Sequence, residues 1–164
     1  MACKLQICGT EPESIVDGAG FRYVIFTQGC PHHCPGCHNP QTHDFNKGKL
    51  VDIEDLFLEI CENPLLKGVT FSGGEPFCQP KPLFELARMV HSRKLDVTTY
   101  TGYLYEELLA RHDPDIDALL NETDVLIDGP FIEEQKDLTL AFRGSRNQRI
   151  IDMNRTRRES SSDR

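Results

Sequence analysis

The chain has 164 residues, 38% of them hydrophobic and 27% charged, and a formal net charge of −8 at pH 7. This length fits one domain with a sizeable core, and the acidic balance argues against non-specific nucleic-acid binding. The longest apolar runs fall far short of the roughly 20 residues of a membrane-spanning helix, and the first residues do not predict a signal peptide. Seven cysteines without an export signal indicate a cytoplasmic protein whose thiols are free or bound to metal.

Strand-like and helix-like patterns alternate along the chain. We expect a short strand at 4–8, a Gly/Pro/Asp-rich loop at 11–20, and a buried strand at 21–27 that runs directly into a cysteine-rich loop. Asp52 is a candidate N-cap for a helix whose apolar residues recur at 53, 56, 57 and 60. Further helices are expected around 83–91, 104–111 and 115–120, further strands at 68–72, 95–101 and 125–128, and weaker strands at 138–142 and 148–151.

This βα alternation predicts an α/β fold with a mostly parallel sheet and right-handed crossovers. A closed barrel of eight units needs about 250 residues, and this chain has about half the units, so we expect a partial barrel that is open along one side. Residues 1–154 are expected to form the single core domain. Residues 155–164 hold no apolar side chain and predict a disordered tail. The Arg-rich end of the chain is either a solvated tail or a docking surface for an acidic partner.

The cysteine-rich loop carries the strongest chemical signal. Cys30, Cys34 and Cys37 stand in a Cys-x3-Cys-x2-Cys spacing with Pro and Gly between them, and thiolates that converge on one point select zinc, copper or an iron–sulfur cluster. A four-iron cluster is normally held by four cysteines, so three would leave one iron open for chemistry. A structural zinc site is closed by four ligands. That alternative stays open, with a fourth ligand from His32, His33 or His38.

The other unusual motifs each follow an expected strand, where α/β folds keep their sites. These motifs are Gly-Gly-Glu-Pro at 73–76, Thr-Gly at 101–102 and Asp-Gly-Pro at 128–130. Gly73 and Gly74 either form an ordinary turn or let backbone approach a ligand. Asp128 is a turn former or a site residue, and core roles for Tyr100 and Thr101 are as plausible as ligand contacts. Cys78 lies near the Gly-Gly turn without a spacing partner.

The cysteine loop and its flanks at 17–22 and 38–40 resemble the cluster motif of the radical S-adenosylmethionine (SAM) enzymes. Together with the segments 72–76, 100–103, 128–131 and 143–148, they resemble the activating proteins of anaerobic ribonucleoside-triphosphate reductase, over residues 5–151. Two positions depart from the pattern. Ala19 stands where the related proteins usually have Pro, and Gly36 stands where many radical SAM enzymes have an aromatic residue.

The resemblance implies a partial radical SAM barrel with a [4Fe-4S] cluster on Cys30, Cys34 and Cys37. It implies that SAM is bound through the backbone, by Gly73, Gly74 and Glu75 at its amino group and by Gly36, Cys37 and His38 at its adenine. An electron from reduced flavodoxin or a similar donor would cleave SAM to methionine and a 5′-deoxyadenosyl radical. That radical would remove a Cα hydrogen from a glycine of the reductase. The alternatives are an activator of another glycyl-radical enzyme such as pyruvate formate-lyase, a radical SAM enzyme with a small substrate, or a non-enzymatic iron–sulfur or zinc module.

Overall fold

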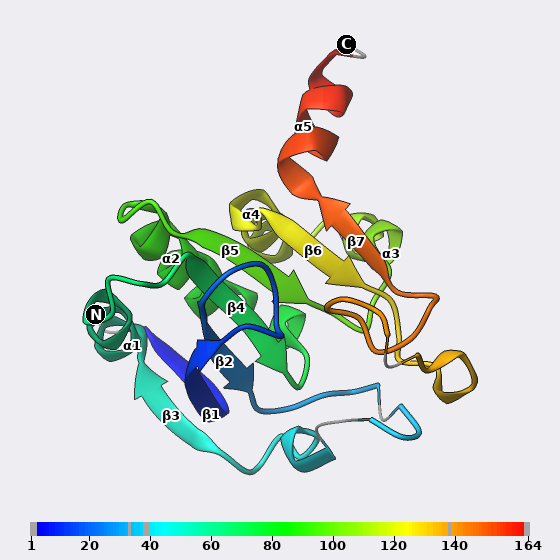
Figure 1. Ribbon diagram of the computed structural model, residues 1–164, viewed down its shortest axis with the longest axis horizontal. Coiled ribbons are helices and arrows are strands. Elements are labelled where there is room, and N and C mark those ends of the chain that lie inside the picture. Colours follow the sequence, from blue (N-terminus) through cyan, green and yellow to red (C-terminus); the bar gives the residue numbers. More distant parts are fainter. Residues whose placement is uncertain (1–2, 33, 38–39, 138, 163–164) are drawn as a thin grey trace.

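The computed structural model describes residues 3–32, 34–37, 40–137 and 139–162. It is an α/β fold built on one open seven-stranded sheet, with the strand order β3-β1-β2-β4-β5-β6-β7 (Figure 1). The strands are β1 (Lys4–Ser14), β2 (Arg22–Thr27), β3 (Lys49–Asp52), β4 (Gly68–Gly73), β5 (Asp96–Tyr100), β6 (Val125–Asp128) and β7 (Arg149–Asp152). The α-helices are α1 (Ile53–Cys61), α2 (Pro80–His91), α3 (Tyr105–Ala110), α4 (Pro114–Glu122) and α5 (Met153–Ser162).

The four central strands β2, β4, β5 and β6 run parallel, as the βα alternation predicted. β1 and β7 flank them in antiparallel pairing, and β3 pairs antiparallel with β1, so β3 has the direction of the central strands. β3 and β7 are therefore the two edges, and the sheet does not close. The expectation of an open, mostly parallel sheet is confirmed.

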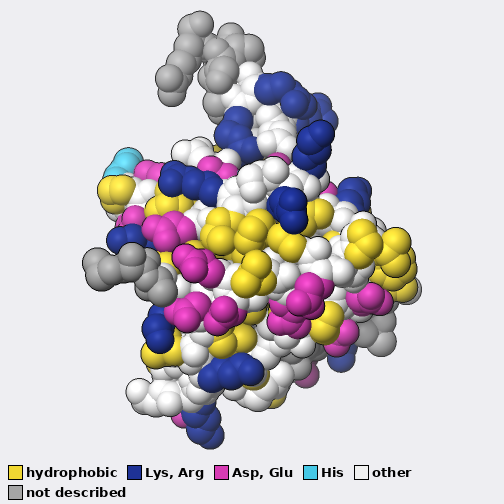
Figure 2. Space-filling model, turned by 90° about the vertical axis from the view of Figure 1, so that its left-hand side faces the viewer, with side chains coloured by type: hydrophobic (Ala, Val, Ile, Leu, Met, Phe, Trp, Pro, Cys, Tyr) yellow, Lys and Arg dark blue, Asp and Glu magenta, His cyan; other side chains and the backbone are white. Residues whose placement is uncertain are grey.

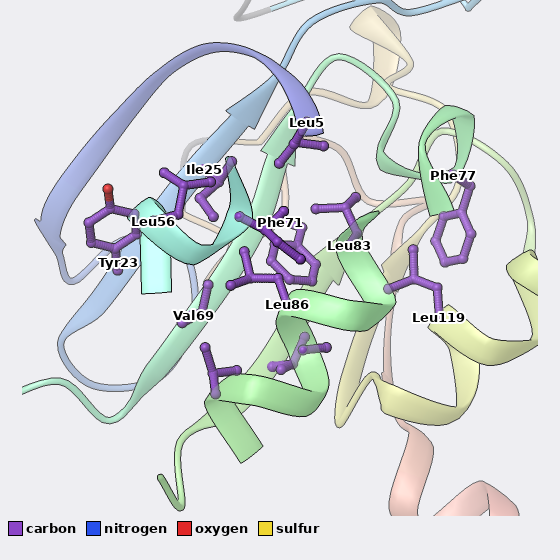
Figure 3. Packing of buried hydrophobic residues seen from close by; sticks show 14 of the residues in the cluster. Leu5, Tyr23, Ile25, Leu56, Val69, Phe71, Phe77, Leu83, Leu86 and Leu119 are labelled. Carbon is purple, nitrogen blue, oxygen red and sulfur yellow. The ribbon is translucent and has the colours of Figure 1, made fainter. Parts of the chain in front are cut away.

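Alternation along the central strands separates an apolar face from a polar one. Ile25 and Phe71 (Figure 3) and also Leu126 belong to the hydrophobic core that α1, α2 and α4 complete. Each such fully buried side chain contributes about 1.5–3 kcal/mol relative to an exposed one. The neighbouring strand residues point the other way. Arg22 donates from Nε to Thr70 Oγ1 at 2.7 Å on that polar face.

The N-terminal strand differs from the prediction. β1 continues to Ser14, through the first four residues of the segment that was expected to be a loop, because it pairs with the whole length of β2. Register shifts between Ile7 and Gly9 and between Glu11 and Ser14 accommodate the residues that favour turns. β3 was not predicted; it is a short, half-exposed edge strand without a strong apolar pattern.

The C-terminal part also contains two differences. No strand forms at 139–142, and Leu138 lies outside the described residues; Asp137 Oδ1 instead accepts from the Thr139 backbone N–H at 2.9 Å in a local turn. The expected disordered tail is the helix α5 in the structure, so the expected boundary at residue 154 falls inside a helix. Asp152 Oδ1 accepts from the Arg155 backbone N–H at 3.0 Å, and Arg157 Nη1 donates to the Leu120 carbonyl at 3.0 Å.

α5 stands away from the body of the molecule (Figure 1). Lys and Arg side chains cluster on this protruding segment and also lie across the body, over which acidic side chains are scattered (Figure 2). Among the described residues, no helix has both the length and the apolar character to cross a bilayer.

Candidate functional site

The motifs that follow the strands meet at one cavity of about 300 Å³ at the carboxyl ends of the central strands. The cysteine loop, the Gly-Gly turn, the Thr-Gly turn and the segment after β6 all reach it, so the expectation that they lie together is confirmed. The segment before β2 closes another side. The residues that line the cavity are Val16, Asp17, Cys30, His32, Cys34, Cys37, His43, Ser72, Gly73, Gly74, Tyr100, Thr101, Gly102, Gly129, Phe131, Leu140, Phe142, Arg143, Gly144 and Gln148.

The cysteine loop is tied at its base to the segment that returns from it. The Gln28 side-chain amide donates to the carbonyls of Gln41 and Asp44 at 3.1 and 2.7 Å, and the Cys30 backbone N–H donates to the His43 carbonyl at 3.2 Å. A tight turn follows, in which the Cys37 N–H donates to the Cys34 carbonyl at 3.1 Å. These hydrogen bonds fix the backbone that carries the three thiols.

The three thiols of the loop line the cavity together, and their chemistry fits an iron–sulfur cluster. Cys30 is buried, while Cys34 and Cys37 are half-buried. Among the described residues, no group of three His, Cys, Asp or Glu side chains converges to hold a single metal ion, and the ligand role of the three thiols stays a prediction. A cluster does not need this convergence, because each thiolate binds a different iron. A zinc ion does need it.

Glu75 joins three of the loops through its side chain, which is fully buried. Its carboxylate accepts from the Thr101 hydroxyl at 2.9 Å, the Gly102 N–H at 2.7 Å and the Phe77 N–H at 3.0 Å. His32 Nε2 lies 2.7 Å from Glu75 Oε1, and since a carboxylate only accepts, Nε2 carries the hydrogen. Glu75 thus connects the cysteine loop, the Gly-Gly turn and the Thr-Gly turn.

The Gly-Gly turn lies against the cysteine loop so closely that side chains are excluded. Gly73 has φ +91°, and a Cβ on Gly74 would lie 2.3 Å from the Gly29 carbonyl oxygen. The N–H groups of Gly74 and Glu75 donate to the carbonyls of Thr27 and Gly29, both at 2.8 Å. Both glycines line the cavity, but the packing of the protein itself already requires them.

The remaining predicted site residues are placed as follows. Gly36, with φ +74°, does not line the cavity; a Cβ there would lie 3.0 Å from the Glu133 side chain. His38 and the alternative zinc ligand His33 lie outside the described residues. Cys78 is exposed in the short 3-10 helix Pro76–Cys78 and does not line the cavity.

The residues whose roles were open from the sequence divide into structural and cavity groups. Asp128 is fully buried and accepts from Arg149 Nε at 2.9 Å and from the Tyr105 N–H at 2.8 Å, so it holds the start of α3. Tyr100 lines the cavity and donates from its hydroxyl to the Phe142 carbonyl at 2.6 Å. Burial, together with the Asp17 charge, raises the pKa of Tyr100, which therefore stays a neutral donor.

Sequence reasoning missed the Glu75–His32 contact and the apolar wall of Phe131, Leu140 and Phe142. The two residues of the contact are 43 positions apart, and no spacing rule links them. The wall comes from an irregular segment that Gln148 organises: its side-chain oxygen accepts from the Gly144 and Ser145 N–H groups, at 2.8 and 3.1 Å.

Comparison with known proteins agrees with this site. The family model of a 4Fe-4S single cluster domain matches residues 16–151. The anaerobic ribonucleoside-triphosphate reductase-activating protein of Haemophilus influenzae is 37% identical over 148 residues, which are 85% of this chain and 92% of that protein. The chain belongs to this family of activating proteins.

Two further similarities lie outside the family. The pyruvate formate-lyase-activating enzyme of Clostridium pasteurianum is 36% identical over 118 residues, which cover 66% of this chain and 49% of that enzyme. The solved structure of QueE from Escherichia coli superposes with a TM-score of 0.48 and 20% identity, over 60% of this chain and 52% of that chain. The latter likeness is too weak to carry an argument. The assignment of the chain to its family therefore rests on the match to the 4Fe-4S domain model and on the similarity to the activating proteins.

Proposed function

We propose that this protein activates anaerobic ribonucleoside-triphosphate reductase by installing a glycyl radical on it. The observation that carries the proposal is the cavity that the three cysteines of the loop, the Gly-Gly turn and the apolar residues Phe131, Leu140 and Phe142 line together. A match over 92% of the length of an activating protein supports the same activity for this chain. The substrate is a protein loop, which the open side of the sheet can admit.

Each part of the cavity has a task in this proposal. Cys30, Cys34 and Cys37 would hold a [4Fe-4S] cluster, which would supply the electron for the reductive cleavage of SAM to methionine and a 5′-deoxyadenosyl radical. The backbone of Gly73, Gly74 and Glu75 binds the amino group of SAM, as the resemblance implies. By the resemblance, main-chain atoms of Gly36, Cys37 and His38 would contact the adenine; of these three residues, Cys37 lines the cavity. The apolar wall of Phe131, Leu140 and Phe142 would exclude water from the cavity during the reaction.

The electron comes from outside the chain, and we propose reduced flavodoxin or a similar donor. We place the reaction in the cytoplasm. No disulfide joins the seven cysteines, all of which lie among the described residues, and reduced thiols fit a reducing compartment.

The decisive experiment incubates the cluster-loaded protein anaerobically with SAM, a reductant and purified reductase. A glycyl doublet in the electron-spin-resonance spectrum of the reductase is expected, together with 5′-deoxyadenosine. Separate replacement of Cys30, Cys34 and Cys37 by Ala should abolish cluster loading, whereas Cys61→Ala and Cys78→Ala should load normally. A loaded protein that cleaves SAM but gives no doublet on the reductase contradicts the proposal. Pyruvate formate-lyase in a parallel sample tests the alternative partner.

A further inference from the structure

Arg143 brings a positive charge to the cavity. It is the single Lys or Arg among the described residues that line the cavity. Its Nη1 donates to the Gln148 carbonyl at 3.0 Å, but its Nε is buried without a hydrogen-bond partner. No carboxylate of the described residues lies within ion-pair distance of this guanidinium. Arg143 therefore has hydrogen-bonding capacity that the protein itself does not use.

A buried and unpaired donor on a charged group is costly, so native structures rarely keep one without a reason. The cavity offers one possible internal partner, Asp17, but Asp17 Oδ2 accepts from the Ser14 hydroxyl at 2.7 Å and forms no ion pair with Arg143. The backbone that follows Arg143 is also fixed, since Gln148 holds the N–H groups of Gly144 and Ser145. The guanidinium is thus held in place before any ligand arrives, which lowers the entropic cost of binding an anion.

We propose that Arg143 binds the carboxylate of SAM. This inference rests on the proposed function, which makes SAM the small molecule of the cavity. SAM carries an ammonium, a sulfonium and one carboxylate, so the carboxylate is its single anionic group and the one that a guanidinium recognises, in a charge-assisted and often bidentate pair. Arg143 and the Gly-Gly turn line the same cavity, so the two charged ends of the amino-acid part of SAM have separate partners.

The competing explanation is that Arg143 only supports the irregular segment through Gln148. The two explanations differ in what a substitution does to different ligands. Loss of a carboxylate partner weakens SAM but not decarboxylated SAM, which keeps the ammonium and the sulfonium. Loss of a structural support weakens both ligands alike. The comparison is a double-mutant cycle between one side chain and one ligand group.

The test measures the dissociation constants of SAM and decarboxylated SAM by anaerobic equilibrium dialysis, with the cluster-loaded protein and no reductant, so that no turnover occurs. Arg143→Gln should weaken SAM about 10- to 100-fold, the range of a hydrogen bond to a charged group, and change decarboxylated SAM less than about twofold. Arg143→Lys should lie between, because it keeps the charge and loses the planar fork. The matched control Arg146→Gln removes an exposed guanidinium that does not line the cavity.

The outcomes separate this inference from the proposed function. Equal weakening of both ligands by Arg143→Gln, or no weakening of either, overturns the role of Arg143 even when the wild-type protein binds SAM and activates the reductase. A wild-type protein that binds no SAM overturns the proposed function itself. Thermal unfolding of the Arg143→Gln protein shows whether the segment still folds, and Arg143→Lys provides the comparison if it does not.

Discussion

The carboxylate of Glu75 offers a direct test of how the site is braced, through the substitution Glu75→Gln. Four donors point at this buried side chain: His32 Nε2, the Thr101 hydroxyl and the N–H groups of Gly102 and Phe77. A glutamine has the same shape but only one acceptor oxygen, and its NH2 group can only donate. At least one N–H of the protein then faces another N–H in a site that water does not reach.

The expected cost follows from these contacts. A buried donor left without a partner costs about 1–3 kcal/mol, and hydrogen bonds to a charged acceptor contribute about 1.5–3 kcal/mol against about 1 kcal/mol for neutral ones. Together these effects predict a loss of about 2–4 kcal/mol in the free energy of unfolding. That loss is a large part of the ~5–15 kcal/mol typical of a native domain.

Urea denaturation of the cluster-free protein measures this loss without any contribution from cluster or SAM. With a denaturant slope of about 2 kcal/mol per molar, the unfolding midpoint should fall by about 1–2 M. The matched control is Glu54→Gln, which removes the same charge from an exposed position on α1 and should change stability by less than about 0.5 kcal/mol. If both variants unfold at the wild-type midpoint, the carboxylate does not hold the loops together and the reasoning is refuted.

Three further substitutions test other contacts of the structure. In Gly102→Ala the new Cβ would lie 2.5 Å from the His32 ring and would push the ring away from Glu75. We expect a protein that folds normally but incorporates less iron. The control is Gly9→Ala, because a Cβ there meets open space. Asp128→Asn weakens the contact between the buried Asp128 side chain and Arg149 and should lower the free energy of unfolding by about 2 kcal/mol. The control Asp55→Asn alters an exposed carboxylate and should leave the free energy of unfolding unchanged. The hydrogen bond to Asp124 raises the pKa of His91. Protonated His91 therefore stabilises the folded protein fully below about pH 6.5, and this stabilisation is lost as the pH rises through the folded-state pKa. His91→Gln should remove that pH dependence of unfolding, and an unchanged profile would contradict the assignment.

The fold could be predicted from the sequence where the local pattern and the tertiary structure agree. The buried strand at 21–27 and the helix after Asp113 are examples, since Asp113 Oδ1 accepts from the Asp115 N–H at 2.8 Å as an N-cap should. The meeting of the motifs at one cavity followed from a rule about parallel strands, which needs only that the strands exist and point the same way.

The parts that could not be predicted depend on contacts between distant residues. β1 runs through residues that favour turns because β2 supplies partners along its length, and no local pattern reports that pairing. α5 forms from polar residues because Arg157 reaches the carbonyls of Leu120 and Thr123. The sequence likewise predicted that Glu75 binds SAM through its backbone. The structure adds that its carboxylate accepts hydrogen bonds from His32 and Thr101, which no local pattern reports.

The crowding around Gly74 changes how genetic data on this protein should be interpreted. Any side chain at this position collides with the carbonyl of Gly29 whether or not a small molecule is present. An inactive Gly74 variant therefore reports a misplaced turn as readily as a lost ligand, and inactivity there does not identify a contact with SAM. Binding roles at such a position are better examined by altering the ligand than by altering the glycine.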